Sequence, residues 1–342
     1  MTNNTFSNAA TSTVNNGESI LDIRDLRVWY KTYGGHVKVL DGVNLHVNKG
    51  EKVGLVGEAG CGKTTTMKAV LRILPHGRAI VKSGEILFQG RDILQMKDKD
   101  LQNVRRSGIS MIFQEPTAAL NPVFTIGTQM LDIIKFSLAG KKNKVGINYR
   151  DMALKAIREV FIPDPERILD CYPNQLSGGM KQRVCIAMSM VTPRELIIAD
   201  EPGTSLDVTI QDQVHRILHK LVDKKGMSLI MITHSLGVAR EMTDRIYVMY
   251  AGNIVEASRT RDLFERPRHP YTLGLLASVP KLTGHGMAEG IYGYIPSYLR
   301  PPAGCRFHPR CPNVMDICKE QKPELMDQGL GHKVACFLYG GN

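Results

Sequence analysis

The sequence predicts an α/β fold built around a mainly parallel sheet, and three observations support this. Apolar segments of strand length alternate with segments of helical spacing. A glycine-rich loop at 57–64 follows the apolar segment 52–56 and precedes a helical pattern. No long series of hairpin-connected strands is apparent. Residues 20–48 are expected to add antiparallel strands, and the C-terminal part is expected to form a small irregular cap that contains cysteines.

Length and composition set the outer limits of this prediction. A chain of 342 residues can form one large domain with an appendage, or two domains. A content of 43% hydrophobic and 23% charged residues is typical of a soluble globular protein. No apolar run approaches the roughly 18 residues that span a bilayer. The polar start lacks the pattern of a secretion signal, so we expect a disordered tail at 1–17 and a cytoplasmic protein.

The net charge of +11 fits an acidic partner such as nucleic acid, an anionic membrane face or a nucleotide. A well-solvated surface explains the same charge equally well. Charge alone therefore does not decide the function.

The segment GEAGCGKTT at 57–65 matches the phosphate-binding pattern G-x-x-x-x-G-K-[ST]. Glycines let backbone N–H groups converge on a polyphosphate at a helix N-terminus. We expect Lys63 to reach the β- and γ-phosphates, Thr64 to bind Mg²⁺ and Thr65 to contact the α-phosphate. A chance glycine-rich turn is the alternative, which the flanking strand and helix disfavour. The glycines assigned to nucleotide binding are Gly57, Gly60 and Gly62.

The segment ELIIADEP at 195–202 predicts a buried strand that ends in two carboxylates. Asp200 is expected to hold the Mg²⁺ shell through water, and Glu201 to orient or deprotonate the attacking water. Many strands end in acids, so this pair is weak support when taken alone. Together with the phosphate loop it predicts nucleotide hydrolysis.

The segment LSGGMKQRVCIAMSM at 176–190 narrows the prediction to a family. Ser177 is a good helix N-cap, and Gly178 and Gly179 expose the backbone at a second anion-binding helix start. Here the sequence resembles the ATP-binding subunits of ABC transporters, whose signature is LSGGQ. Met180 replaces the usual glutamine.

The resemblance implies roles for further residues along the chain. Gln114, in FQEP, is expected to reach Mg²⁺ and the attacking water, and His234 the γ-phosphate. Residues 205–207 resemble the loop called the D-loop. Tyr30, with Tyr33 as the alternative, is expected to stack on adenine. The motifs and the resemblance together predict three catalytic residues, Glu201, His234 and Gln114, and two Mg²⁺ ligands, Thr64 and Gln114.

The resemblance also implies partners. In the family, two ATPase domains enclose two ATP molecules, each between the phosphate loop of one domain and the SGG of the other. This chain carries one set, so we expect a second ATPase subunit, with a heterodimer favoured over a homodimer. Two membrane permease subunits are expected to contact a helical subdomain at about 115–176. We expect an extracellular solute-binding protein as an indirect partner, and we do not expect nucleic acid as a partner. The expected location of the protein is the cytoplasmic face of the membrane.

The C-terminal part resembles one subgroup of that family. HPYT, within 266–282, and the segment GCRFHPRCP at 304–312 resemble the extension of oligopeptide, dipeptide and nickel importer ATPases. We therefore expect an ATPase domain at 18–258 and an extension at 259–342. The predicted function is an ATPase that energises import of a peptide-like solute. The alternatives are a soluble ABC ATPase that acts on nucleic acid or ribosomes, and a catalytically silent structural subunit.

Four cysteines lie in this extension: Cys305, Cys311, Cys318 and Cys336. The inferred compartment disfavours stable disulfides, whereas four thiolates suit zinc or an iron–sulfur cluster. The paired short spacing of structural zinc sites is absent, and similar extensions in this importer family carry a [4Fe–4S] cluster. We expect such a cluster, with zinc or four buried small side chains as alternatives. The other cysteines (Cys61, Cys171 and Cys185) are not expected to participate. Because the site lies far in sequence from the ATP motifs, we expect ATP binding without it.

Overall fold

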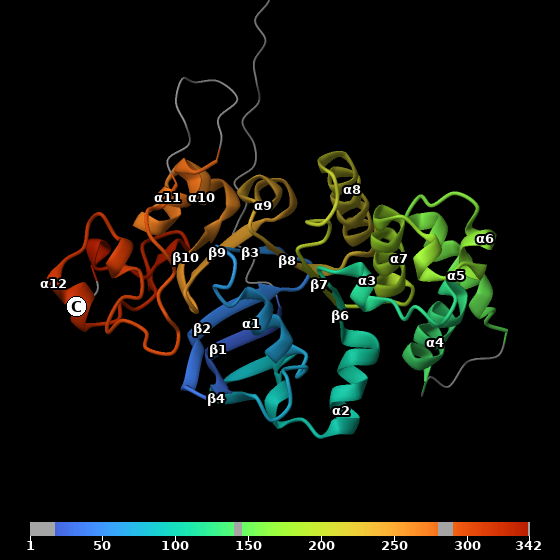
Figure 1. The fold of residues 1–342 in the computed structure, drawn as a ribbon, viewed down its shortest axis with the longest axis horizontal. Coiled ribbons are helices and arrows are strands. Elements are labelled where there is room, and N and C mark those ends of the chain that lie inside the picture. Colours follow the sequence, from blue (N-terminus) through green and yellow to red (C-terminus); the bar gives the residue numbers. More distant parts are fainter. Residues whose placement is uncertain (1–17, 140–145, 280–289, 341–342) are drawn as a thin grey trace, which may run out of the picture.

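A computed structural model describes residues 18–139, 146–279 and 290–340. Among these residues, two sheets form the framework of the chain, one of four strands and one of eight (Figure 1). The tail predicted at 1–17 lies outside the described residues.

The smaller sheet is antiparallel and comes mostly from the N-terminal part. Its strands, in the order β2-β1-β4-β5, are β2 (Gly35–Asn48), β1 (Ser19–Thr32), β4 (Ala79–Phe88) and β5 (Arg91–Asp92). Alternate residues of β1, such as Leu21 and Ile23, are buried, as expected for strands with one covered face. The predicted antiparallel N-terminal strands are confirmed.

The larger sheet has a parallel centre. Its order is β11-β12-β10-β9-β3-β8-β7-β6, and the neighbours from β9 to β6 run parallel. The bounds are β3 (Lys52–Val56), β6 (Ile109–Ile112), β7 (Leu196–Asp200), β8 (Ser228–Thr233), β9 (Arg245–Tyr250), β10 (Asn253–Arg259), β11 (Met326–Asp327) and β12 (Lys333–Val334). Every residue of β7 and β8 is buried, which explains why both read as continuous apolar runs. The predicted α/β core is confirmed.

Helices enclose this sheet and extend the molecule at both ends (Figure 1). Those next to the sheet are α1 (Lys63–Val70), α8 (Val208–Lys225) and α9 (Leu236–Met242). Helix α2 (Asp98–Asn103) precedes β6 in the sequence. Five helices gather at one end: α3 (Pro116–Ala119), α4 (Ile126–Leu138), α5 (Tyr149–Glu159), α6 (Pro165–Asp170) and α7 (Gly178–Met190). Four of these, α4 to α7, share a hydrophobic core with the sheet. The subdomain boundaries at 115 and 176 remain a prediction.

The C-terminal extension lies at the opposite end and is built into the larger sheet. It contains α10 (Thr260–Glu265), α11 (Pro270–Ala277) and α12 (Asp316–Glu320). Strand β12 pairs antiparallel with β10 and β11 with β12, so the C-terminal part continues the main sheet at its edge. The sequence suggested an irregular cap. These strands are two residues long, which is too short to show a periodic pattern.

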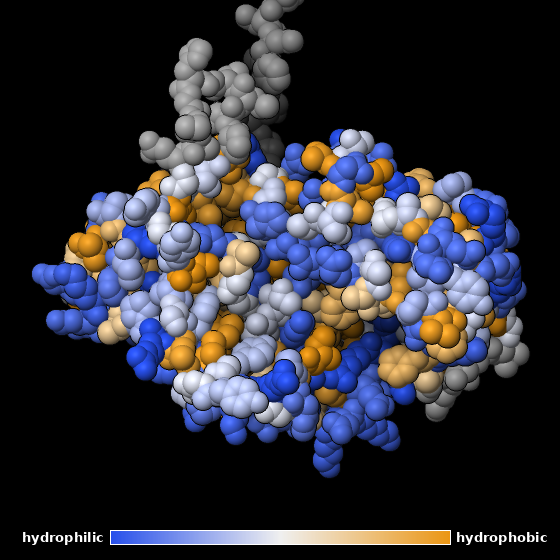
Figure 2. All heavy atoms as spheres, in the orientation of Figure 1, coloured by the Kyte–Doolittle hydropathy of each residue, from blue (hydrophilic) through white to orange (hydrophobic). Residues whose placement is uncertain are grey.

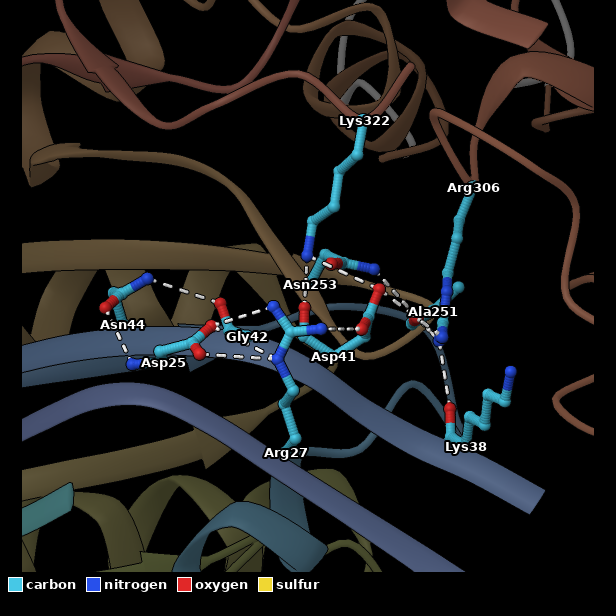
Figure 3. A network of polar contacts seen from close by, with 10 residues as sticks. All are labelled: Asp25, Arg27, Lys38, Asp41, Gly42, Asn44, Ala251, Asn253, Arg306 and Lys322. Carbon is cyan, nitrogen blue, oxygen red and sulfur yellow. Dashed lines mark hydrogen bonds and ion pairs between the residues drawn. The ribbon is translucent and has the colours of Figure 1, made fainter. Parts of the chain in front are cut away.

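A network of charged groups joins this extension to the N-terminal sheet (Figure 3). Asp41 of β2 accepts from Arg27 at 3.1 Å and pairs with Arg306 at 3.6 Å and Lys322 at 3.4 Å. Burial acts to raise the pKa of Asp41, but the three cations outweigh it and hold that pKa below its usual value. Arg306 also donates to the Lys38 and Ala251 carbonyls. One carboxylate thus anchors two segments of the extension.

On the face shown in Figure 2, hydrophilic residues cover much of the surface and apolar residues form several separate groups. In the parts of the chain that the structure describes, no helix is both long enough and apolar enough to cross a membrane.

Candidate functional site

A cavity of about 570 Å³ opens where the phosphate loop meets the ends of the parallel strands. Gln114 comes two residues after β6, Glu201 directly follows β7, and His234 directly follows β8. The carboxyl ends of neighbouring parallel strands meet at one edge, which brings these side chains together. The lining consists of Gly57, Glu58, Ala59, Gly60, Gly62, Lys63, Thr64, Thr65, Gln114, Glu201, His234 and Leu275.

The phosphate loop packs closely against the sheet. A Cβ atom on Gly57 would lie 2.1 Å from the Met249 carbonyl oxygen, so no larger residue fits there without a backbone shift. Lys63, whose exposure is 5%, donates from Nζ to the carbonyls of Gly57 at 2.8 Å and Glu58 at 3.0 Å. The ammonium is thus held inside the loop at the start of α1. Loop amides, a helix N-terminus and a buried cation together suit a polyphosphate.

Thr64 and Asp200 form a pair of oxygen donors beside the loop. The Thr64 hydroxyl donates to the Asp200 carboxylate at 3.1 Å. Burial raises the pKa of Asp200, the Thr64 hydrogen bond opposes this, and the neighbouring carboxylate of Glu201 adds to it. A bound cation would favour the ionised form of Asp200. Hydroxyl and carboxylate oxygens are the ligands that Mg²⁺ prefers, so the donor set fits this ion.

Three side chains hold the carboxylate of Glu201. Its Oε2 atom lies 3.1 Å from Nδ1 of His234 and 3.3 Å from both the Gln114 amide nitrogen and the Thr204 hydroxyl. The side chain is 13% exposed. The backbone of Glu201 has a φ of 46°, in the left-handed region, where a residue other than glycine costs about 1–3 kcal/mol. Such strain persists where surrounding contacts enforce it, as the three hydrogen bonds do here.

Comparison with known proteins identifies the family. A family model described as "ABC transporter" matches residues 40–204, and one described as "Oligopeptide/dipeptide transporter, C-terminal region" matches residues 255–318. The dipeptide transport ATP-binding protein DppD of Bacillus subtilis is 42% identical over 323 residues, which cover 94% of this chain and 95% of that protein. The oligopeptide transport ATP-binding protein OppD of Salmonella typhimurium is 38% identical and 97% of each chain is covered.

This chain belongs to the ATP-binding proteins of oligopeptide and dipeptide ABC transporters. As a member of this family it is an ABC-type ATPase, for which ATP and Mg²⁺ are expected. The prediction of an ABC-type transport ATPase is confirmed. The alternative of a soluble ATPase acting on nucleic acid or ribosomes is not favoured, because the relatives are transport proteins.

The fold of this ABC ATPase is also similar to solved structures. The ATP-binding cassette MJ0796 bound to ADP and Pi, described as dimeric, aligns with a TM-score of 0.62 at 26% identity. The alignment covers 70% of this chain and 99% of that chain. The similarity supports the ATPase fold derived above.

Some of the predicted site residues of the ABC ATPase lie outside the cavity. Ser177 caps α7 by accepting from the Met180 amide at 3.3 Å, and Gly178 and Gly179 begin the same helix, but none of the three lines the cavity described above. Tyr30 packs against the core of the N-terminal sheet, and Tyr33 is fully exposed. The roles of these residues remain predictions.

Two further residues close to the site of this ABC ATPase suit their local backbone. Gly203 has a φ of 109°, and glycine tolerates this conformation better than any other residue. Ser235 caps α9 by accepting from the Val238 amide at 3.4 Å. Both residues fit the local backbone.

The four cysteines of the extension come to one corner of the ABC ATPase. Burial raises the pKa of Cys305 to about 11, and the thiols of Cys318, Cys336 and Cys311 contribute further to this increase. The Cys305 amide also donates to the Cys318 carbonyl at 2.9 Å. Within the described ranges, however, no three His, Cys, Asp or Glu side chains are placed to hold a metal ion. The predicted metal site is therefore not confirmed.

Sequence reasoning did not assign several residues of the extension to the ATP site. Leu275 of α11 lines the cavity, and Tyr271, Tyr298 and Arg310 contact the phosphate loop. The motifs HPYT and GCRFHPRCP contain Tyr271 and Arg310. Those motifs indicated the subgroup, and nothing in their spacing indicated contact with a loop more than 200 residues earlier.

Proposed function

We propose that this ABC ATPase energises the import of a peptide-like solute through separate membrane permease subunits. One observation carries the proposal: the same chain contains the phosphate-loop cavity with the Glu201 carboxylate and, after it in sequence, the oligopeptide/dipeptide C-terminal region. Relatives that match nearly the whole chain are named as dipeptide and oligopeptide transport proteins. Their names support a peptide as the solute of this chain.

The residues of the cavity have distinct proposed roles. Lys63 binds the β- and γ-phosphates and Thr65 the α-phosphate, while Thr64, Gln114 and, through water, Asp200 hold Mg²⁺. Glu201 orients or deprotonates the attacking water. The contacts of His234 and Gln114 with Glu201 support this role, because they fix the carboxylate in one position. His234 contacts the γ-phosphate.

The proposed assembly has two ATPase subunits and two permease subunits. The segment 177–179 completes the ATP site of the second ATPase subunit, consistent with its position outside the cavity described above. That subunit is a paralogue of this chain, which makes the pair a heterodimer. The complex lies on the cytoplasmic face of the membrane and receives its solute from an extracellular binding protein.

Removal of this chain tests the import proposal. In a strain of the source organism that lacks it, uptake of labelled di- and oligopeptides is expected to fall to background while export is unchanged. Uptake of nickel and of oligosaccharides is measured in the same strain, so that a solute of another class would be detected. Nickel is included because the extension also resembles those of nickel importers. Normal uptake of every one of these solutes, in a strain without a second copy of the system, would contradict the proposal.

We also propose that the four cysteines of the extension bind a [4Fe–4S] cluster. Their number, their thiol chemistry and their closeness support this, since such clusters are held by four cysteine thiolates. The other three thiols help to raise the pKa of Cys305, and those of Cys311 and Cys318 help to raise the pKa of Cys336. When bound, a cluster supplies a covalent link between loop segments. The cysteine residues must give up their protons to bind it.

Iron analysis tests the cysteine site. The protein purified without oxygen is expected to be brown and to contain about four irons per chain. Cys311→Ser is expected to lose the iron, whereas Cys171→Ser, which changes a half-buried cysteine outside the extension, is expected to keep it. A colourless preparation with one zinc and no iron would refute the cluster.

A further inference from the structure

Three side chains of the C-terminal extension contact the phosphate loop directly. The Glu58 amide donates to the Tyr271 hydroxyl at 2.9 Å. The Tyr298 hydroxyl donates to the Gly60 carbonyl at 2.8 Å. Arg310 donates from Nη1 to both carboxylate oxygens of Glu58, at 3.0 and 3.1 Å. The extension therefore reaches the same loop that is assigned to ATP.

Two of these contacts, those of Tyr271 and Arg310, meet the Lys63 contact at Glu58. Its amide is bonded to Tyr271, its carboxylate to Arg310 and its carbonyl to the Lys63 ammonium at 3.0 Å. The position of this residue, together with that of the Gly57 carbonyl, thus sets where the ammonium lies. The side chain of Glu58 is not part of the phosphate-binding pattern, which allows any residue there.

The extension holds two of these contacting groups, Arg310 and Tyr271, through further contacts of their own. The Arg310 side chain is 6% exposed and also donates to the carbonyls of Tyr292 and Ile291, each at 3.0 Å. Tyr271 is fully buried, with ring centroids 4.7 Å from Tyr250 and 5.5 Å from Phe307. Buried, multiply bonded groups lose little freedom when they hold a loop.

We propose that Tyr271, Tyr298 and Arg310 are positioning residues for ATP binding, which act by fixing Glu58 and Gly60 of the phosphate loop. The inference concerns the nucleotide site itself and does not depend on the proposed solute. The extension then serves the ATPase by shaping the loop before the nucleotide arrives. A loop already in its bound conformation binds more tightly, because less ordering accompanies binding.

If Arg310 only held the extension in place, loosening the extension at another contact would weaken ATP binding equally. A second contact of the extension allows this alternative to be tested. Lys322 docks the same extension on Asp41 of the N-terminal sheet and does not touch the phosphate loop (Figure 3). Lys322→Met should therefore loosen the docking of the extension without moving Glu58. Arg310→Met removes the bond to Glu58 while it keeps an apolar stem of similar length.

The test measures Mg·ATP affinity of the full chain together with KM and kcat of the assembled complex. Arg310→Met is expected to weaken ATP binding and raise KM by about tenfold, the scale of a lost charge-assisted hydrogen bond, with kcat within about twofold. Arg310→Lys is expected to recover part of the affinity. Tyr271→Phe, which leaves the Glu58 amide without its acceptor, is expected to weaken binding by about fivefold.

A double variant separates a direct route from general disturbance. If Arg310 acts through Glu58, then Glu58→Gln together with Arg310→Met should bind ATP no more weakly than Arg310→Met alone. Wild-type affinity in folded Arg310→Met would overturn the proposal, as would an equal loss in Lys322→Met. If Arg310→Met does not fold, Tyr271→Phe decides the outcome, and unchanged ATP affinity in that variant overturns the proposal.

Discussion

Glu201→Gln is expected to lower ATP turnover of the assembled complex by at least ~10²-fold, the scale of losing a positioned base. Glutamine keeps the size of the side chain and its hydrogen bonds with neighbours, but it cannot accept a proton from water. Mg·ATP binding should persist, because Lys63 and the loop amides are unchanged. Turnover and nucleotide affinity measured on the same preparation check both parts of this expectation.

Glu195→Gln is the matched control for that experiment. Glu195 lies at the other end of β7, is exposed and contacts Gln89. The same acid-to-amide change there should leave turnover near the wild-type value. Full turnover in Glu201→Gln would refute the assigned role of Glu201, and an equal loss in both variants would point to a general effect on the fold.

Lys63→Ala is expected to weaken Mg·ATP binding by about 10²-fold, because removal of one member of a desolvated charge pair costs about 2–5 kcal/mol. The loss falls on binding, since the ammonium would contact the phosphates before any bond breaks. Equilibrium binding of a fluorescent ATP analogue measures it directly.

Lys49→Ala provides the comparison for Lys63→Ala. The Lys49 side chain is 66% exposed and lies 3.8 Å from Glu18, a separation at which surface pairs contribute little. Its removal should leave ATP affinity unchanged. Wild-type affinity in Lys63→Ala, in a protein with an unchanged melting temperature, would contradict the assignment of the phosphate loop.

The parts of the site that sequence predicts best are those set by local chemistry. The phosphate loop is recognisable because glycines, lysine and threonine must occur at fixed spacing around one helix start. Gln114, Glu201 and His234 each follow an apolar strand, and parallel strands bring their carboxyl ends to one edge. Their meeting is therefore a consequence of the strand pattern.

The contacts between the extension and the loop were not predictable in this way. Tyr271 and Arg310 lie 213 and 252 residues from Glu58, and their positions depend on how the whole extension packs. Distance in sequence suggested that the cysteine site and ATP binding are independent. In the structure Arg310, directly before Cys311, contacts the phosphate loop. The ATP affinity of Cys311→Ser therefore tests whether ATP binding is independent of the cysteine site.

The energising role of this chain is tested most directly by complementation of the deletion strain. Wild-type protein and Glu195→Gln are expected to restore uptake of labelled peptide, and Glu201→Gln is expected to leave it at background, with equal amounts of all three proteins on the membrane. Restored peptide uptake with Glu201→Gln would contradict the account, because transport would then proceed without the carboxylate assigned to ATP hydrolysis.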